Sequence, residues 1–216
     1  MLLAATCPAR AGETVPDMGC GVGAAMYCLA GRVPGVHLTD VELEPWVAAL
    51  ARRNGEADVV EGDALCLPPV LRRSFDHVIC NSPYFTAGAG RTASRPAREA
   101  AMREDGPGGF GKWLDAAARR AGRKGSVTVI ARAERLQEMI VSLSPRLGHL
   151  VILPITSRAG QEAHRVVVQG IKGRRAPLRL LAPLILHEGA MHDGDRDNHT
   201  VAAQQILRDG RAFSLA

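Results

Sequence analysis

A glycine-rich segment near the start of the chain carries residue types whose spacing points to ligand binding. Asp17 is followed by Gly19, Gly21 and Gly23, so that a glycine stands at every second position. Glycines let backbone amides approach a ligand where any Cβ would collide, and a helix N-terminus directly after them supplies positive potential. The segment therefore predicts a site for a polar or anionic ligand group, with a purely structural turn as the alternative.

Acidic residues follow the next two apolar runs. Asp40, Glu42 and Glu44 lie in D-V-E-L-E-P, and Asp63 follows Gly62 after the second run. A carboxylate at a strand end can accept hydrogen bonds from both hydroxyls of a ribose, and the acid-x-acid-Pro pattern favours Glu42 over Asp40 and Glu44. Glu44 also fits an acidic residue at a helix N-terminus. Asp63 could accept from an adenine amine, or belong to an ordinary Gly-Asp turn.

The segment N-S-P-Y-F, residues 81–85, follows a further apolar run and offers a different chemistry. The Asn81 side-chain oxygen and the Ser82 carbonyl are two hydrogen-bond acceptors, and the ring of Tyr84 can stack on a nucleic acid base. Pro83 fixes its own φ and restricts Ser82, so that the carbonyl is held in one direction. The segment predicts a clamp for a planar amine, with an Asn-Ser-Pro turn as the alternative.

Alternating strands and helices must position these motifs. Apolar, β-branched runs predict strands over 13–17, 35–42, 57–63, 74–80 and 125–131. Helix-length segments lie between them, over 22–31, 45–54, 109–122 and 133–143. This alternation predicts an α/β fold whose parallel sheet is covered by helices on both faces.

The last third of the chain predicts antiparallel rather than parallel strands. The runs 149–155 and 163–171 predict an antiparallel hairpin at the end of the sheet. After it come an apolar segment over 176–189 and a helical pattern near 200–208. With no repeat or low-complexity linker, we expect a single domain over residues 1–216, with a core of about 10–170 and a C-terminal extension of about 171–216.

Composition and charge limit the functional class. The chain has 216 residues, of which 46% are hydrophobic and 23% charged, as expected for a globular protein. Five cysteines without a CxxC pair argue against a zinc ribbon or a disulfide framework. Neither a secretory signal nor a membrane-length apolar run is present in the sequence, so we expect a cytoplasmic protein without a membrane partner. A net charge of +5 is compatible with a nucleic acid partner.

The motifs together resemble a known family. Four successive strand ends carry D-x-G-x-G-x-G, an acid, Gly-Asp and Asn-Ser-Pro-Tyr, a set that resembles the class I S-adenosylmethionine-dependent methyltransferases over about residues 10–170. The last motif is similar to the [N/D]-P-P-[Y/F] signature of members that methylate planar amide or amine nitrogens. The tail, which begins V-V-V-Q-G-I-K-G, is similar to that of bacterial tRNA adenine-N6 methyltransferases that modify valine tRNA beside the anticodon.

The resemblance implies a fold, a cofactor and a partner. The fold is Rossmann-like, with a mostly parallel seven-stranded sheet, an antiparallel C-terminal hairpin and helices on both faces. The cofactor is S-adenosyl-L-methionine and the partner is tRNA. The residues that the resemblance implies around the methionine portion of the cofactor are Asp17, Gly19, Gly21 and Gly23. Glu42 would hold the ribose and Asp63 the adenine.

The resemblance implies catalytic roles for Asn81, Ser82, Pro83 and Tyr84. The exocyclic amine of adenine is a poor nucleophile because its lone pair is delocalised into the ring. Two acceptors that bind both of its N–H groups favour the pyramidal nitrogen needed for attack on the sulfonium methyl. Neither a metal nor a strong general base is then required.

Substrate contacts are expected in the segment that follows. Tyr84 and Phe85 are aromatic, and Arg91, Arg95, Arg98 and Arg103 stand in a long segment that is poor in apolar residues. We expect these arginines to contact tRNA phosphates, with arginine on a loop of no specific role as the alternative.

The seven histidines are expected to have no catalytic role. His37 and His77 lie in strand patterns, where we expect structural roles. A solvated loop without a metal is expected around the histidines and aspartates of the tail, which are His187, His192, Asp193, Asp195, Asp197 and His199.

Three departures from the family pattern bear on these predictions. Pro16 stands where relatives carry a leucine or similar residue, and it predicts a local defect in a central strand because proline cannot donate a ladder hydrogen bond. The likeness also starts close to the first residue, which bears on cofactor binding. Ser82 replaces the first proline of the usual pair, a mild change because that position contributes its carbonyl.

The alternative functions to tRNA adenine methylation are methylation of a protein glutamine or of DNA adenine, and a non-catalytic RNA-binding role.

Overall fold

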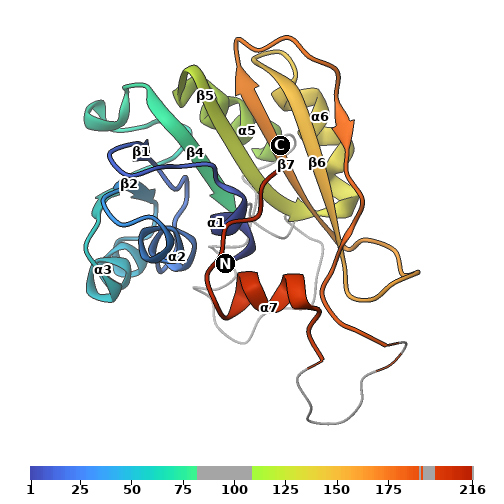
Figure 1. The fold of residues 1–216 in the computed structure, drawn as a ribbon. Coiled ribbons are helices and arrows are strands. Elements are labelled where there is room, and N and C mark those ends of the chain that lie inside the picture. Colours follow the sequence, from blue (N-terminus) through green and yellow to red (C-terminus); the bar gives the residue numbers. More distant parts are fainter. Residues whose placement is uncertain (82–108, 190, 192–197, 216) are drawn as a thin grey trace.

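Strands and helices alternate along the first two thirds of the chain, as the sequence predicts (Figure 1). The computed structural model describes residues 1–81, 109–189, 191 and 198–215. The strands of this part are β1 (Thr14–Val15), β2 (His37–Glu42), β3 (Asp58–Glu61), β4 (Phe75–Asn81) and β5 (Ala121–Arg132). The helices are α1 (Leu2–Thr6), α2 (Ala24–Arg32), α3 (Pro45–Asn54), α5 (Gly109–Arg120) and α6 (Leu136–Leu143).

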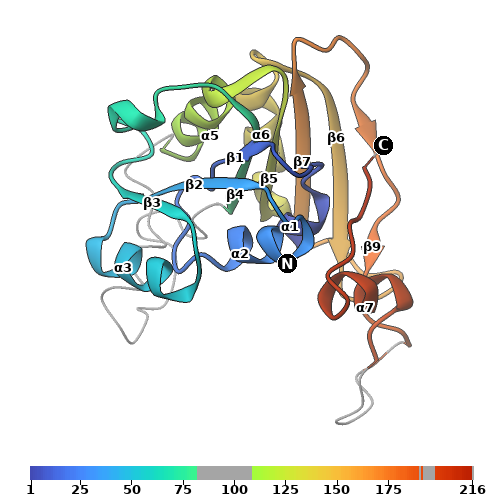
Figure 2. The ribbon, with the colours of Figure 1, turned by 60° about the vertical axis from the view of Figure 1, so that its left-hand side comes forward.

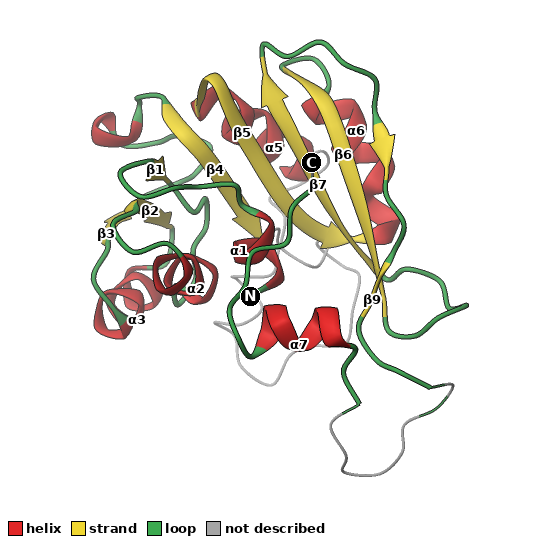
Figure 3. Ribbon diagram, viewed as in Figure 1, coloured by secondary structure: helices red, strands yellow, loops and turns green. Residues whose placement is uncertain are grey.

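The strands form one sheet in the order β3-β2-β1-β4-β5-β7-β6 (Figure 3). Regular ladders make two pieces, β1-β2-β3 and β4-β5-β7-β6-β8, and the isolated parallel bridge Asp17↔Ile79 joins them. All pairs among β1 to β5 are parallel, which confirms the predicted fold class.

The predicted antiparallel hairpin is confirmed. It consists of β6 (Leu147–Thr156) and β7 (Arg165–Lys172), and β7 also pairs antiparallel with β5. The predicted count of seven strands is slightly too low, because two-residue strands β8 (Arg179–Leu180) and β9 (Leu184–Ile185) pair parallel with the open edge of β6. Strands this short leave no periodic pattern, so their pairing depends on the neighbouring edge.

Pro16 produces the predicted defect in the central strand. The regular ladder of β1 ends at Val15, and only isolated bridges continue it at Asp17 and Met18. Proline has no N–H to donate, but the Pro16 carbonyl still accepts from the Ile79 N–H at 3.0 Å. The connection between β1 and β4 therefore survives the interruption.

Helices cover both faces of the sheet (Figure 2). One core cluster contains apolar residues of α1, α2 and α3 together with α7 (Val201–Leu207), and the other contains those of α5 and α6. Successive residues of β4 alternate between them, because Ile79 belongs to the first cluster while Val78 and Cys80 belong to the second. Both faces of the central strand are therefore buried, as expected for a parallel sheet.

The two chain ends pack together on the first face. Four of the five residues of α1 are buried, and the Phe213 N–H donates to the Ala5 carbonyl at 2.8 Å. The Gln169 side chain of β7 donates to the Thr6 carbonyl at 2.9 Å, which ties the end of α1 to the sheet. In the part of the chain that the structure describes, no helix is long and apolar enough to span a bilayer.

Candidate cofactor and methyl-acceptor site

The carboxyl ends of the parallel strands gather four of the predicted motifs at one edge. Asp17 follows β1, Glu42 ends β2, Asp63 follows β3 and Asn81 ends β4. The strand order places them in the row Asp63, Glu42, Asp17, Asn81. Neighbouring strands lie about 4.8 Å apart, so the row extends over about 14 Å. Open α/β sheets bind their ligands at this edge.

The glycine-rich turn has the backbone geometry that its spacing predicts. Gly19, Gly21 and Gly23 have φ values of 73°, 58° and 87°, in the left-handed region that favours glycine. The N–H groups of Gly19 and Cys20 both donate to the Val41 carbonyl, which anchors the turn to β2. A Cβ placed on Gly21 would meet no atom of the described residues within 4 Å. The outer side of the turn is therefore open toward the space where a ligand would lie.

Glu42 holds this turn in place through its carboxylate. Its Oε2 accepts from the Gly21 N–H at 2.8 Å and its Oε1 accepts from the Glu44 N–H at 3.0 Å. The residue is only 7% exposed, and each oxygen keeps further acceptor capacity. The geometry distinguishes Glu42 from Glu44, which is the N-cap residue of α3.

Two buried carboxylates lie at the base of the same turn. Asp17 and Asp40 are 1% and 0% exposed, and the Asp17 N–H donates to Asp40 Oδ1 at 2.6 Å. Burial, together with the nearby Glu42 carboxylate, raises the pKa of Asp17 to about 7, and burial beside Asp17 raises the pKa of Asp40 well above its usual range. Among the described residues, Asp17 Oδ1 and Asp40 Oδ2 have no hydrogen-bond partner.

These features fit a ligand that carries a cation and a diol. A positive group near Asp17 and Asp40 would offset the cost of burying two carboxylates. Glu42 offers acceptor oxygens to a pair of hydroxyls, and the open side of Gly21 leaves room for the chain that connects the two groups. S-adenosyl-L-methionine has a sulfonium, an ammonium and a ribose, so the residues present fit this cofactor.

Asp63 and Asn81 lie at the two ends of the row. Asp63 is exposed, and its Oδ1 accepts from the Leu65 N–H at 2.7 Å, so the predicted turn is present, and its Oδ2 has no partner among the residues that the structure describes. Asn81 is exposed and lies opposite Ile130 of β5. The remaining predicted residues lie outside the described part of the chain, namely Ser82, Pro83, Tyr84, Phe85, Arg91, Arg95, Arg98 and Arg103.

Two aromatic residues that support the turn were not predicted. Trp113 of α5 is buried, and its Cζ2 lies 3.5 Å from the position of a Cβ on Gly19. The Tyr27 hydroxyl donates to the carbonyls of Ala51 and Gly55, which ties α2 to the end of α3. Aromatic residues on apolar helix faces look like ordinary core residues in a sequence, so only the packing of the helices reveals this support.

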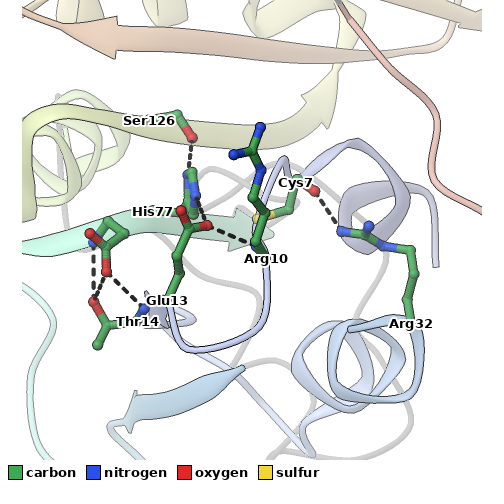
Figure 4. A network of polar contacts seen from close by, with 8 residues as sticks. Cys7, Arg10, Glu13, Thr14, Arg32, His77 and Ser126 are labelled. Carbon is green, nitrogen blue, oxygen red and sulfur yellow. Dashed lines mark hydrogen bonds and ion pairs between the residues drawn. The ribbon is translucent and has the colours of Figure 1, made fainter. Parts of the chain in front are cut away.

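The opposite, amino-terminal ends of the same strands carry a polar network whose members are paired (Figure 4). His77 Nδ1 lies 2.8 Å from Ser126 Oγ, and its Nε2 lies 2.9 Å from Glu13 Oε2. Asp76 Oδ2 accepts from both the N–H and the hydroxyl of Thr14. These contacts join β1, β4 and β5, which supports the structural role expected for His77.

The tail histidines are arranged differently. His187 and His199 stack with their ring centroids 4.7 Å apart, and His187 Nδ1 lies 2.9 Å from Asn198 Oδ1. His192 and the three aspartates of the tail lie outside the described residues. Within the described ranges, no group of three or more His, Cys, Asp or Glu side chains is arranged to hold a metal ion.

Comparisons with known proteins identify methyltransferases among the relatives of this chain. A family described as a methyltransferase domain matches residues 15–103. The chain is 31% identical over 160 residues to a tRNA1(Val) (adenine(37)-N6)-methyltransferase of Shewanella sp. (strain MR-4), a match that covers 70% of this chain and 66% of that protein. It is also 36% identical over 85 residues to a 4-amino-L-phenylalanine/4-methylamino-L-phenylalanine methyltransferase of Streptomyces pristinaespiralis, covering 37% of this chain and 29% of the relative.

A solved structure covers nearly the whole chain. A predicted O-methyltransferase from Agrobacterium tumefaciens superposes with a TM-score of 0.78 at 26% sequence identity, covering 99% of this chain and 97% of its own. The fold, the motifs at the carboxyl edge and the cofactor that they fit all indicate the same family. The chain belongs to the class I S-adenosylmethionine-dependent methyltransferases.

Proposed function

We propose that the protein transfers a methyl group from S-adenosylmethionine to the exocyclic N6 of adenine in tRNA. The observation that carries the proposal is the place of Asn81, at the end of β4 and directly beside the glycine-rich turn. Met18, the residue before Gly19, donates its N–H to the Ile79 carbonyl at 3.0 Å, and Ile79 is two residues before Asn81. A nitrogen held by Asn81 would thus be next to the methionine end of the cofactor.

In this proposal, different residues at the strand ends bind different parts of the cofactor. Asp63 accepts from the adenine amine, and Glu42 accepts from the ribose hydroxyls while it holds the Gly21 amide. Asp17, with the turn formed by Gly19, Gly21 and Gly23, surrounds the methionine portion. The cofactor supplies an electrophilic methyl group, which a nitrogen nucleophile takes as the carbon–sulfur bond breaks.

The proposed acceptor clamp begins at Asn81. Its side-chain oxygen accepts one N–H of the adenine amine, and the Ser82 carbonyl accepts the other. Pro83 restricts Ser82, and Tyr84 and Phe85 stack on or beside the base. Arg91 and Arg95 contact tRNA phosphates. Acceptors that are already in place stabilise the developing charge on nitrogen without reorganisation in the transition state.

Relatives support a nitrogen acceptor of this kind. The name of the Shewanella protein states methylation at N6 of adenine, and the name of the Streptomyces protein gives substrates that carry an amino or methylamino group on an aromatic ring. The tRNA acceptor follows the Shewanella protein, whose match covers more of this chain, and a net charge of +5 is compatible with it. A cytoplasmic enzyme without a membrane partner is consistent with such a substrate.

The proposal is tested by incubating the protein with methyl-labelled cofactor and, separately, total tRNA, genomic DNA, a release factor and 4-amino-L-phenylalanine. We expect label in the adenine of tRNA. Asn81→Ala should lower the rate by roughly 10²–10³, the cost of removing one preorganised polar contact, while cofactor affinity changes little. Asn81→Asp keeps an acceptor oxygen and serves as the matched variant. Label only in another acceptor, or full activity of Asn81→Ala, would overturn the proposal.

A further inference from the structure

A hollow lies beside the Asp63 end of the cofactor site. It has a volume of about 550 Å³ and lies between the segment that follows β3 and the outer side of α5. One wall begins at Ala64 and Leu65, and the Leu65 N–H donates to the Asp63 carboxylate. The hollow therefore starts within two residues of the proposed adenine contact and continues along α5, away from the edge of the sheet.

The charged side chains that line this hollow are mainly cations, namely Arg72, Lys112, Arg119 and Arg120. Asp115 is the one acid in its lining, and it is already paired with Arg119 at 2.7 Å and with Arg146. The two arginines neutralise that carboxylate, so the hollow keeps a net positive charge. Polyanions are the ligands that such a field attracts.

Three of these cations have unused hydrogen-bonding capacity among the described residues. Lys112 and Arg120 have no carboxylate partner among the residues that the structure describes, and Lys112 is exposed. Arg72 donates through Nε to the Leu67 carbonyl at 2.7 Å, which leaves its two terminal nitrogens for another acceptor. Guanidinium groups with both outer nitrogens free match the paired oxygens of a phosphate.

The spacing along the helix suits a strand of nucleic acid. Lys112, Arg119 and Arg120 lie on one side of α5, and seven residues of an α-helix rise about 10 Å. This length is sufficient to face more than one phosphate of a nucleic acid strand. Leu65 is 41% exposed at the mouth of the hollow and offers an apolar contact for a sugar or a base.

We infer that the hollow between residues 64–72 and α5 binds the sugar-phosphate backbone of tRNA on one flank of the methylated nucleotide. The inference rests on the proposed function, since it takes tRNA as the substrate. Helix α5 contacts both the hollow and the cofactor turn. Lys112 lines the hollow, and Trp113, the next residue, packs against Gly19 of the turn. Because α5 packs against the cofactor turn, RNA bound along α5 has a fixed position relative to that turn and to Asn81 beside it.

The test compares two variants that each remove two positive charges. Lys112→Ala/Arg120→Ala changes the hollow, whereas Arg10→Ala/Arg53→Ala removes two exposed arginines elsewhere, before β1 and on α3. Affinity for an unmodified tRNA transcript is measured across a salt series, together with affinity for S-adenosylmethionine and thermal unfolding. We expect the first variant to bind tRNA roughly tenfold more weakly and to lower the salt slope by about 2, at about 0.9 per phosphate contact. The KM for tRNA should rise, with cofactor affinity unchanged.

The outcomes separate this inference from the proposed function. If tRNA is methylated but both variants show the same salt slope, the hollow does not bind its backbone and the inference is overturned while the function stands. If tRNA is not an acceptor, the proposed function fails. In that case the same variants are compared with a single-stranded RNA oligonucleotide as the probe, and equal slopes overturn the inference independently. Preferential loss of binding to an acidic peptide rather than to RNA would also overturn it.

Discussion

The two edges of the same sheet use polar residues in opposite ways. At the amino edge, His77 contacts Ser126 and Glu13, so both ring nitrogens are occupied (Figure 4). At the carboxyl edge, Asp17 Oδ1 and Asp40 Oδ2 are buried without a partner among the described residues. Paired groups stabilise a fold, whereas buried acceptors with unused capacity cost free energy unless a ligand satisfies them. The contrast is that the amino edge satisfies its own polar groups, whereas the carboxyl edge leaves buried acceptors that a ligand could satisfy.

The largest effect on cofactor affinity is expected from Glu42→Gln at the carboxyl edge. The variant removes the charge of the carboxylate that holds Gly21 and is proposed to hold the ribose hydroxyls. Hydrogen bonds to a charged group contribute about 1.5–3 kcal/mol, so cofactor affinity should fall roughly 10- to 100-fold. Isothermal titration calorimetry measures it, with Glu61→Gln, an exposed glutamate at the end of β3, as the control. Equal affinities would remove Glu42 from the cofactor site.

At the amino edge, His77→Leu should reduce stability without affecting the ligand. The substitution leaves the buried Ser126 hydroxyl without its contact to His77, which costs about 1–3 kcal/mol of unfolding free energy, whereas the partly exposed Glu13 still accepts from the Arg10 N–H. Urea unfolding measures the change, and His37→Leu, an exposed histidine of β2, is the matched control. Cofactor affinity should be unchanged in both. A loss of affinity in His77→Leu with intact stability would contradict the division between the edges.

The pH dependence of stability should have opposite signs at the two edges. Burial raises the pKa of Asp17 to about 7, so its folded form binds a proton that the unfolded form, with a pKa near 3.8, has lost. Unfolding free energy should therefore fall as pH rises from about 4 to 7, by at most about 1.4 kcal/mol per pH unit for one proton. The hydrogen bonds from Thr14 lower the pKa of Asp76, so its contribution is present above pH 4 and lost in acid.

Asp17→Asn separates these two contributions. The variant cannot ionise at this position, so the decline in unfolding free energy between pH 4 and pH 7 should become shallower. Glu56→Gln, an exposed carboxylate before β3, should leave the profile unchanged. Denaturant titrations at several pH values provide the measurement. An unchanged slope in Asp17→Asn would mean that Asp17 carries no excess proton in the folded state.

The smallest effect distinguishes backbone strain from ligand contact. Gly21 and Gly160 both have positive φ, 58° and 75°, and a Cβ on either meets no atom within 4 Å in the described part of the chain. Alanine at each should cost about 1 kcal/mol of stability through strain alone. Only Gly21→Ala should also weaken cofactor binding, because its Cβ would enter the ligand space. Calorimetry on the two variants checks this, and equal cofactor affinity would place the ligand elsewhere.

The fold followed largely from local patterns. Helix α3 spans the predicted 45–54, because Pro45 at its first turn and apolar residues at helical spacing act locally. The break at Pro16 was also predictable, since it depends on a missing N–H. The strands β8 and β9 were not predictable, because two-residue strands form only where the β6 edge is already in place.

The site was predicted less completely than the fold. Residues at strand ends could be recognised because turns and strand ends follow from composition, and parallel strands bring their carboxyl ends together. The pairing of Asp17 with Asp40 and the support of Gly19 by Trp113 join residues 23 and 94 positions apart. Contacts over such distances depend on strand order and helix packing, which no local pattern encodes.

The sequence by itself determined the alternation of strands and helices, the glycine-rich turn and the residue types that end each strand. These properties follow from backbone geometry and the spacing of apolar residues, which act within a few positions. Only the tertiary structure decided that the Glu42 carboxylate holds the Gly21 amide, and that the cations of α5 and Arg72 line a hollow next to Asp63. Burial and pairing decide which polar groups remain available to a ligand, and both arise only when distant segments pack together.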